Sequence, residues 1–184
     1  MDAYQAMWLV FIIVWMLAAI ASKRTVRRQT LSSRILQGVI VILGFLLLLQ
    51  PWRFQALDIR FVPAAPATTV CGLTLTAAGI GIAFWARFAL GRNWSGTVTV
   101  KQDHQLIRNG PYRIVRHPIY SGFLLAMAGT AIGYGMMTCL LGLALTFVGL
   151  WTKWKTEEKF MVEQFGAQYL QYRREVKAVI PGVL

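Results

Sequence analysis

The stretch from Ile119 to Thr152 reads IYSGFLLAMAGTAIGYGMMTCLLGLALTFVGLWT, and none of its 34 residues is charged. As one helix it would be about 50 Å long, whereas the hydrocarbon core of a bilayer is about 30 Å thick. Gly133-Tyr134-Gly135 lies near the middle of the stretch. We therefore expect two helices, residues 118–133 and 136–152, joined by a tight hairpin. Each half is short for a membrane span, so both should extend past the apolar run at the end opposite the turn.

Three further apolar runs precede this hairpin, and each predicts a membrane span. They cover residues 3–21, 35–52 and 68–88. The third run is rich in small residues, which let membrane helices approach closely, so we expect it to be central in the bundle. These small residues are Gly72, Ala77, Ala78, Gly79 and Gly81.

The first run could also be a signal peptide, because Ala19-Ile20-Ala21 resembles a cleavage site. A signal peptide carries positive charge before its apolar core. Here Asp2 precedes the run, and the basic residues Lys23 and Arg24 follow it. We interpret residues 3–21 as an uncleaved first span.

The composition agrees with a protein that sits in lipid. Hydrophobic residues make up 57% of the 184 residues and charged residues 14%, whereas soluble domains are about 45–50% apolar and about 25% charged. The two cysteines, Cys71 and Cys139, both lie inside apolar runs and form neither a disulfide framework nor a zinc motif. The predicted fold is a single all-α integral membrane domain, residues 1–184, with five transmembrane helices.

The basic residues are distributed unevenly between the runs, and this predicts the orientation. Of 19 Lys and Arg residues, five lie in residues 22–34, six in 87–118 and six from Lys153 onward, whereas two lie in 52–67. By the positive-inside rule the N-terminus is outside and the C-terminus is cytoplasmic. The membrane would be the bacterial inner membrane, or the endoplasmic reticulum if the protein is eukaryotic. The same bias accounts for the net charge of +12 and argues against a nucleic-acid partner.

Polar residues that could perform chemistry are concentrated in two cytoplasmic segments, residues 91–118 and 153–184. The first ends in Arg116-His117-Pro118, and Pro118 suits the first turn of the fourth span. Free N–H groups at that helix start favour a bound anion. Anchoring at the membrane edge, where Arg, His and Tyr are common, explains the same residues equally well.

The second segment begins with charged residues directly after the fifth span. Glu157 and Glu158 should lie on a helix that continues through Phe165 and stops at Gly166. A solvated ion pair between Lys153 and Glu157 is the simple alternative. Further on there is an amphipathic stripe, for which a position on the membrane surface is the simple interpretation. Its members are Tyr169, Tyr172 and Val176.

Several reaction classes lack the residues that they need. The only histidines are His104 and His117, neither cytoplasmic segment contains cysteine, and neither HExxH nor GxSxG occurs. We therefore expect no metal site and no serine hydrolase. Spans one, two, four and five contain no charged residue, which argues against a transporter.

The stretch from Gly110 to Gly122, GPYRIVRHPIYSG, resembles the signature of the isoprenylcysteine carboxyl methyltransferases, which the related phospholipid N-methyltransferases share. The tail resembles the second half of that signature, with Glu157-Glu158 followed by Phe165-Gly166, Tyr169, Tyr172 and Ile180-Pro181. The resemblance covers residues 70–184. It implies a multi-span methyltransferase that uses S-adenosylmethionine without a Rossmann domain, with the cofactor site formed by the loop before span four and the C-terminal helical tail.

The resemblance also implies individual roles. A basic residue four positions before the first Glu contacts the methyl acceptor in the family; it is typically Arg, and here it is Lys153, which cannot form the bidentate contact of Arg. The cofactor contacts carried over are His104, Gln105, Leu106, Ile107, Tyr112, His117, Pro118, Ile119, Tyr120 and Glu157.

Methyl transfer from a sulfonium is an in-line displacement that depends on positioning and desolvation. A carboxylate acceptor is already ionised at neutral pH and needs no base, whereas an ammonium acceptor would need one. The residues expected to act in the transfer are Lys153, His117 and Glu158, and those expected to contact the lipophilic acceptor from the bilayer are Lys153, Trp85, Phe88 and Trp151. We expect O-methylation of a prenylated cysteine; N-methylation of an aminophospholipid and a non-catalytic membrane scaffold or binding protein are the alternatives.

Overall fold

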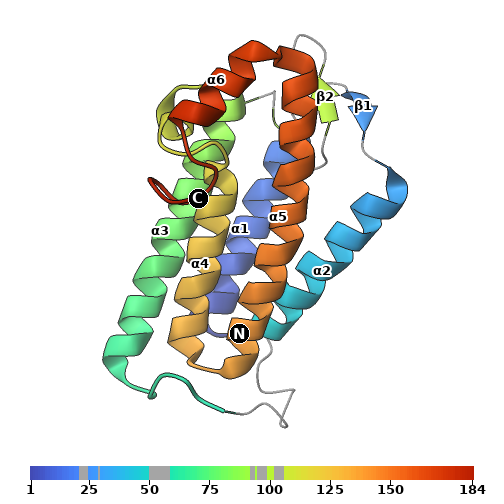
Figure 1. Ribbon diagram of the computed structural model, residues 1–184. Coiled ribbons are helices and arrows are strands. Elements are labelled where there is room, and N and C mark those ends of the chain that lie inside the picture. The colour runs from blue at the N-terminus through green and yellow to red at the C-terminus, as the bar shows by residue number, and fades with distance from the viewer. Residues whose placement is uncertain (21–24, 29, 50–58, 92–93, 95–98, 102–105) are drawn as a thin grey trace.

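The computed structural model describes residues 1–20, 25–28, 30–49, 59–91, 94, 99–101 and 106–184. The described chain is helical apart from one short pair of strands (Figure 1). The helices are α1 (Ala3–Ile20), α2 (Leu31–Leu49), α3 (Pro66–Leu90), α4 (Pro118–Tyr134), α5 (Met137–Phe165) and α6 (Ala167–Glu175), with a 3₁₀ turn η4 (Gly110–Arg113) before α4. The strands are β1 (Thr25–Arg28) and β2 (Thr99–Lys101).

Four of these helices, α1, α2, α3 and α5, are long and apolar enough to cross a membrane. The prediction of an all-helical membrane protein is therefore confirmed. Helix α4 has 17 residues, which gives about 26 Å, and it lies lengthwise between α3 and α5 (Figure 1). That α4 also crosses the membrane, which would bring the number of spans to five, remains a prediction.

The hairpin between the last two long helices is confirmed. Helix α4 ends at Gly135, whose φ of 68° is in the left-handed region that glycine adopts readily, and α5 starts two residues later. The segment before α3 holds this turn by two backbone hydrogen bonds. Phe61 N–H donates to Gly135 O at 2.9 Å, and Met137 N–H donates to Ile59 O at 2.9 Å.

Only one of the two helices extends past the apolar run. Helix α5 continues through Phe165 and ends at Gly166, as predicted. Its 29 residues span about 43 Å, so the charged turns from Lys153 onward project beyond a 30 Å core. The expected extension of α4 is wrong, because Pro118 lacks an N–H, and the chain before it folds back as the 3₁₀ turn η4.

Helices α3 and α4 pack with their backbones almost in contact. A Cβ atom added at Gly79 would lie 2.3 Å from Ala126 N, and one added at Gly122 would lie 2.6 Å from Ala83 N. Such distances are too short for any side chain, so glycine is required at the crossing. The glycines that make this contact are Gly72 and Gly79 on α3 and Gly122 and Gly129 on α4.

The other three small residues that were predicted to make close contacts, Ala77, Ala78 and Gly81, do not take part. Ala77 and Ala78 are exposed, and nothing lies within 4 Å of a Cβ added at Gly81. Helix α3 lies at one side of the bundle and α4 lies inside it (Figure 1), so the expectation that the third span is central is wrong. The small residues indicated a close helix contact but not how many neighbours the helix has.

Helix α1 is tied to the bundle through Trp8, which is 1% exposed. The indole N–H of Trp8 donates to Thr130 Oγ1 of α4 at 3.0 Å, and its ring makes edge-on contacts with Phe45 of α2 and Phe123 of α4. These contacts place α1, α2 and α4 around one aromatic cluster.

Strands β1 and β2 pair antiparallel and lie at the same end of the molecule as α6 (Figure 1). These strands were not predicted from the sequence. Each strand has three or four residues, and a pairing between segments so distant in the chain leaves no local signal.

Candidate active site

Three segments meet at the end of the bundle where α6 lies (Figure 1): the chain just before α4, the charged end of α5, and the chain that follows α6. The backbone joins the first to the last, because Arg116 N–H donates to Lys177 O and His117 N–H donates to Ala178 O, both at 2.8 Å. The C-terminal chain thus runs parallel to residues 115–117, with one isolated bridge between Val115 and Lys177.

Glu157 lies on the side of α5 that faces the start of α4. Tyr120 O–H donates to Glu157 Oε1, and His117 Nδ1 is 3.5 Å from Glu157 Oε2. The Glu157 side chain is 24% exposed. One turn earlier on α5, Lys153 Nζ lies 5.5 Å from the centre of the Tyr120 ring.

Glu158 is buried on the neighbouring face of α5 and is surrounded by cationic groups. Arg116 donates to Glu158 Oε1 from Nε at 2.9 Å and from Nη2 at 2.6 Å, and His117 Nε2 lies 3.3 Å from the same oxygen. Arg173 Nε lies 3.4 Å from Glu158 Oε2. His117 therefore lies between two carboxylates.

This arrangement sets the protonation of all three groups. Burial opposes charge on His117, but its contacts with Glu157 and Glu158 outweigh burial and raise the pKa of the imidazole. Burial also opposes ionisation of the two carboxyl groups, yet His117 and Lys153 lower the pKa of Glu157, and His117 and Arg116 lower the pKa of Glu158 to about 2. Only a doubly protonated imidazole donates to both carboxylates at once. Glu158 is thus a poor candidate for a general base.

Three aromatic rings form a wall beside these charges. The rings of His117 and Tyr120 are 5.6 Å apart and nearly parallel, and Trp154 lies 6.2 Å from the first and 6.4 Å from the second. Trp154 is 2% exposed and was not among the predicted site residues. Its position three residues before Glu157, on the same side of a helix, is the signal that could have identified it.

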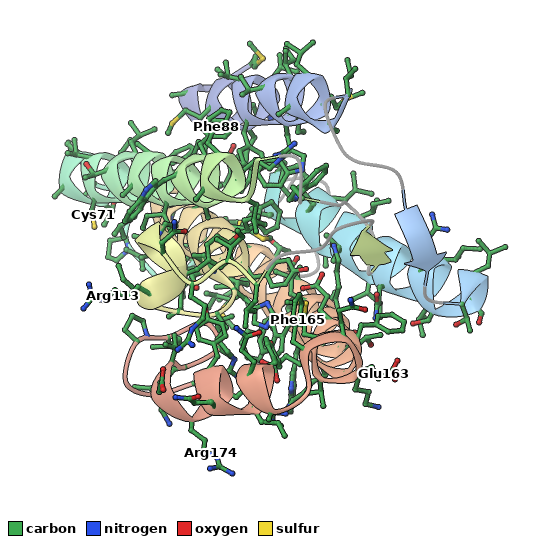
Figure 2. The ribbon with its side chains drawn as sticks, turned by 90° about the horizontal axis from the view of Figure 1, so that it is seen from above. Cys71, Phe88, Arg113, Glu163, Phe165 and Arg174 are labelled. Atoms are coloured by element: carbon green, nitrogen blue, oxygen red, sulfur yellow. The ribbon has the colours of Figure 1, made fainter. Side chains whose placement is uncertain are left out.

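Helix α6 covers Tyr112 of η4. Both Tyr169 and Tyr172 are 2% exposed, and Tyr172 O–H donates to Tyr112 O. The interpretation that this stripe lies on the membrane surface is therefore wrong: its tyrosines pack inward against the site. Figure 2 shows Arg174 of α6 pointing away from the bundle.

The structure brings most of the predicted polar residues together. A chain of contacts links Lys153 to Tyr120, Tyr120 to Glu157, and Glu157 through His117 to Glu158, and Pro118 is buried at the start of α4. Ile119, Leu106 and Ile107 are half-buried, and Tyr112 lies beneath α6. The predicted contacts His104 and Gln105 lie outside the described residues.

The predicted apolar acceptor residues are not gathered in one place. Trp85 and Phe88 on α3 are 51% and 61% exposed, and Trp151 on α5 is 47% exposed. Helix α4 separates α3 from α5 (Figure 1). The structure therefore does not bring these three side chains together.

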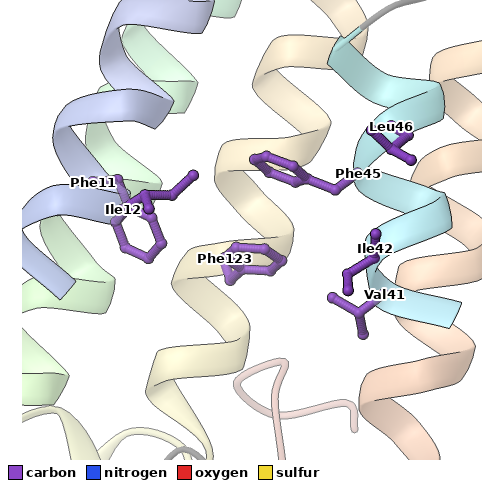
Figure 3. Close-up of a pocket in the computed structure, with 7 residues that line it drawn as sticks. All are labelled: Phe11, Ile12, Val41, Ile42, Phe45, Leu46 and Phe123. Atoms are coloured by element: carbon purple, nitrogen blue, oxygen red, sulfur yellow. The ribbon is translucent and has the colours of Figure 1, made fainter. Parts of the chain in front are cut away.

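An apolar cavity of about 240 Å³ lies elsewhere, between α1, α2 and α4 (Figure 3). Two of its lining residues, Val41 and Phe123, also pack against the cluster of Leu150, Trp154 and Val179, together with Tyr120. The cavity and the polar site are thus connected through this apolar cluster, which contains Trp154. The lining residues are Phe11, Ile12, Val41, Ile42, Phe45, Leu46 and Phe123.

Comparison with known proteins places this geometry in context. Residues 67–168 match the family model described as phospholipid methyltransferase. The protein-S-isoprenylcysteine O-methyltransferase of Schizosaccharomyces pombe is 33% identical over 135 residues, which cover 70% of this chain and 55% of the relative. The Homo sapiens protein of the same name is 31% identical over 142 residues, 73% of this chain and 50% of the relative.

A solved structure is also similar. The eukaryotic intramembrane Ras methyltransferase ICMT (isoprenylcysteine carboxyl methyltransferase) superposes with a TM-score of 0.57 at 25% identity, covering 84% of this chain and 54% of that chain. The chain spans about half the length of the relatives that it matches.

Proposed function

Because this chain belongs to the phospholipid methyltransferase family, we propose that it is a membrane enzyme that transfers a methyl group from S-adenosylmethionine to the carboxylate of a prenylated cysteine or a similar lipophilic acceptor. The observation that supports this best is the apolar cluster around Trp154, against which both Tyr120 of the charged site and two residues of the apolar cavity pack. A water-soluble cofactor and a lipid acceptor need such a junction between two phases. The names of the relatives point to the same acceptor class.

The residues present suit the cofactor. Glu157 is partly exposed, and its carboxylate has about four lone-pair sites, of which Tyr120 and His117 engage two. The spare sites can accept hydrogen bonds from an ammonium or from ribose hydroxyls. The aromatic wall of Tyr120 and Trp154 suits a cation or a flat heterocycle. When bound, S-adenosylmethionine supplies a methyl group on a positively charged sulfur.

This chain's own residues supply position and charge. Lys153 lies one helical turn from Glu157, beside Tyr120, where its ammonium can hold the negative group of an acceptor. A carboxylate acceptor needs no general base, which agrees with the ion-paired state of Glu158. The buried ring of Trp154 helps to exclude water, which strengthens every charge interaction in the site.

The acceptor's lipid part is assigned to the cavity between α1, α2 and α4. Every residue that lines the cavity is apolar. A lipid chain there would end at Phe123 and Val41, next to Trp154. This places the reacting end of the acceptor at the charged end of α5.

The orientation belongs to the same proposal: the site faces the cytoplasm, the N-terminus lies outside, and α4 crosses the membrane as the fourth of five spans. Reporter fusions at Ala64, Tyr134 and Leu184 test it. We expect a cytoplasmic signal only from the fusion at Leu184. A cytoplasmic signal at Tyr134 would refute the five-span orientation in which α4 crosses the membrane.

The decisive test of activity is an acceptor comparison with purified protein. We expect methyl label from S-adenosylmethionine to appear in a small prenylcysteine analogue and not in phosphatidylethanolamine. Label in the phospholipid alone would establish aminophospholipid N-methylation instead. Binding of S-adenosylmethionine that is too weak to saturate, with no labelled acceptor, would indicate a scaffold or binding protein.

A further inference from the structure

Glu157 and Glu158 are adjacent in sequence but have different surroundings. The Glu157 side chain is 24% exposed and that of Glu158 is 6% exposed. Glu157 faces the aromatic wall, whereas Glu158 is enclosed by cationic groups from two other segments of the chain. A buried carboxylate of this kind either performs chemistry or holds structure together, and its contacts distinguish the two.

Four nitrogen atoms from three residues surround the carboxylate of Glu158. Arg116 Nε, Arg116 Nη2 and His117 Nε2 approach Oε1, and Arg173 Nε approaches Oε2. A carboxylate offers about four acceptor sites. The ion pairs with Arg116 and Arg173 disfavour protonation of this carboxyl group, so it is a weak base toward an acceptor molecule.

Arg116 connects Glu158 to the end of α6. With one edge of its guanidinium fixed on Glu158, its Nη1 donates to Val176 O and, at 3.3 Å, to Arg173 O. These carbonyls lie at the C-terminal end of α6, where a cation is favoured. The helix end is thus capped by a side chain that Glu158 orients.

We propose that Glu158 is a positioning residue whose carboxylate, through Arg116 and Arg173, holds α6 and the chain after it closed over the candidate site. The closed arrangement includes the backbone bonds from Arg116 and His117 to residues 177–178 and the seating of Tyr172 on Tyr112. Glu158 also contacts His117. Loss of the Glu158 charge should therefore loosen both α6 and the contacts of His117 with Glu157 on the proposed cofactor side of the site.

The test uses limited proteolysis of cofactor-free protein in detergent, a readout that does not depend on activity. Trypsin can cut after Arg173, Arg174 and Lys177, all of which are exposed. We expect E158Q to be cut there about tenfold faster than wild type, the scale of losing a charged hydrogen bond. The matched control E163Q changes an exposed carboxylate on the same helix and should be cut at the wild-type rate.

Binding and pH dependence separate positioning from catalysis. We expect E158Q to bind S-adenosylmethionine about tenfold more weakly, while its kcat shows the same pH dependence as wild type. Unchanged cleavage in E158Q would overturn the inference whatever the activity. If E158Q is cut at the wild-type rate and its kcat also loses one limb of the pH dependence, the inference is overturned, because that result would make Glu158 a general base.

A second variant covers the case in which E158Q does not fold. R116K keeps the positive charge but cannot contact Glu158 and the end of α6 at once, so it should show the same faster cleavage. Wild-type cleavage of R116K would also overturn the inference. The inference rests on the proposed function only for the measurement of cofactor binding. If E158Q is cut faster but the wild-type protein binds no S-adenosylmethionine, the proposed function is refuted, whereas the role of Glu158 in holding α6 in place is supported.

Discussion

The replacement of Glu157 by Gln is the sharpest test of the cofactor site. The substitution keeps the shape of the side chain but removes its charge. In the structure Glu157 accepts a hydrogen bond from Tyr120 O–H and faces His117 Nδ1 at 3.5 Å. An amide would turn its NH₂ group toward one of these donors. The variant therefore loses both the acceptor for a cofactor ammonium and its own alignment.

The expected magnitude follows from the burial of this side chain. Because Glu157 is 24% exposed, solvent screens it only in part. A hydrogen bond to a charged group contributes about 1.5–3 kcal/mol, which corresponds to a rise of about 10- to 150-fold in the Kd of S-adenosylmethionine. Glu163→Gln on the same helix changes an exposed carboxylate, and its Kd should stay within about twofold of wild type.

The assay is equilibrium binding of S-adenosylmethionine to purified protein in detergent, with thermal unfolding as the check that each variant is folded. Equal Kd values for the Glu157 and Glu163 variants would refute the assignment. They would return Glu157 to a simple ion pair with Lys153.

Three further predictions concern the acceptor, the helix packing and pH. Lys153→Ala should raise the KM for the acceptor and leave the Kd of S-adenosylmethionine within about twofold; the reverse pattern would place Lys153 on the cofactor side. Gly79→Leu should lower the Tm by about 5 °C or more, because a Cβ there meets the α4 backbone, whereas Gly81→Leu, which meets nothing within 4 Å, should leave the Tm unchanged. Glu158 has its pKa lowered from 4.5 to about 2, so its stabilisation is present above pH 4.5 and is lost as the pH falls toward 2; His117, with a raised pKa, stabilises at low pH and loses this effect as the pH rises through its folded value. The Tm of wild type should therefore fall more steeply below pH 4.5 than that of Glu158→Gln, and parallel curves would contradict the ion cluster.

The long helices could be predicted because lipid imposes a simple length rule. Residues 68–88 were expected to span, and the helix observed is Pro66–Leu90. The hairpin followed from an uncharged run too long for one crossing, and Gly166 marked the end of α5. A hairpin returns the start of α4 and the end of α5 to the same side, so His117 and Glu157 had to meet.

The details of the polar end could not be predicted in the same way. Arg116 pairs with Glu158 across 42 residues and caps a helix 60 residues away. The tyrosines of α6 form an apolar stripe that would suit a membrane surface as well as a protein surface. Periodicity shows that such a face is buried, but not against what.

The apolar cavity could not be predicted from the sequence either. In a soluble protein an apolar face marks the core, but in lipid every outward face is apolar as well, so Phe11 and Val41 look no different from their neighbours. The cavity exists only because α1 and α2 stand around Phe123 of α4 without closing over it. The family model begins at residue 67, so six of the seven lining residues, all but Phe123, precede the matched region. If a lipid chain binds there, the part of the sequence that matches the family holds the transfer chemistry, and the two helices before it select which lipid reaches that chemistry.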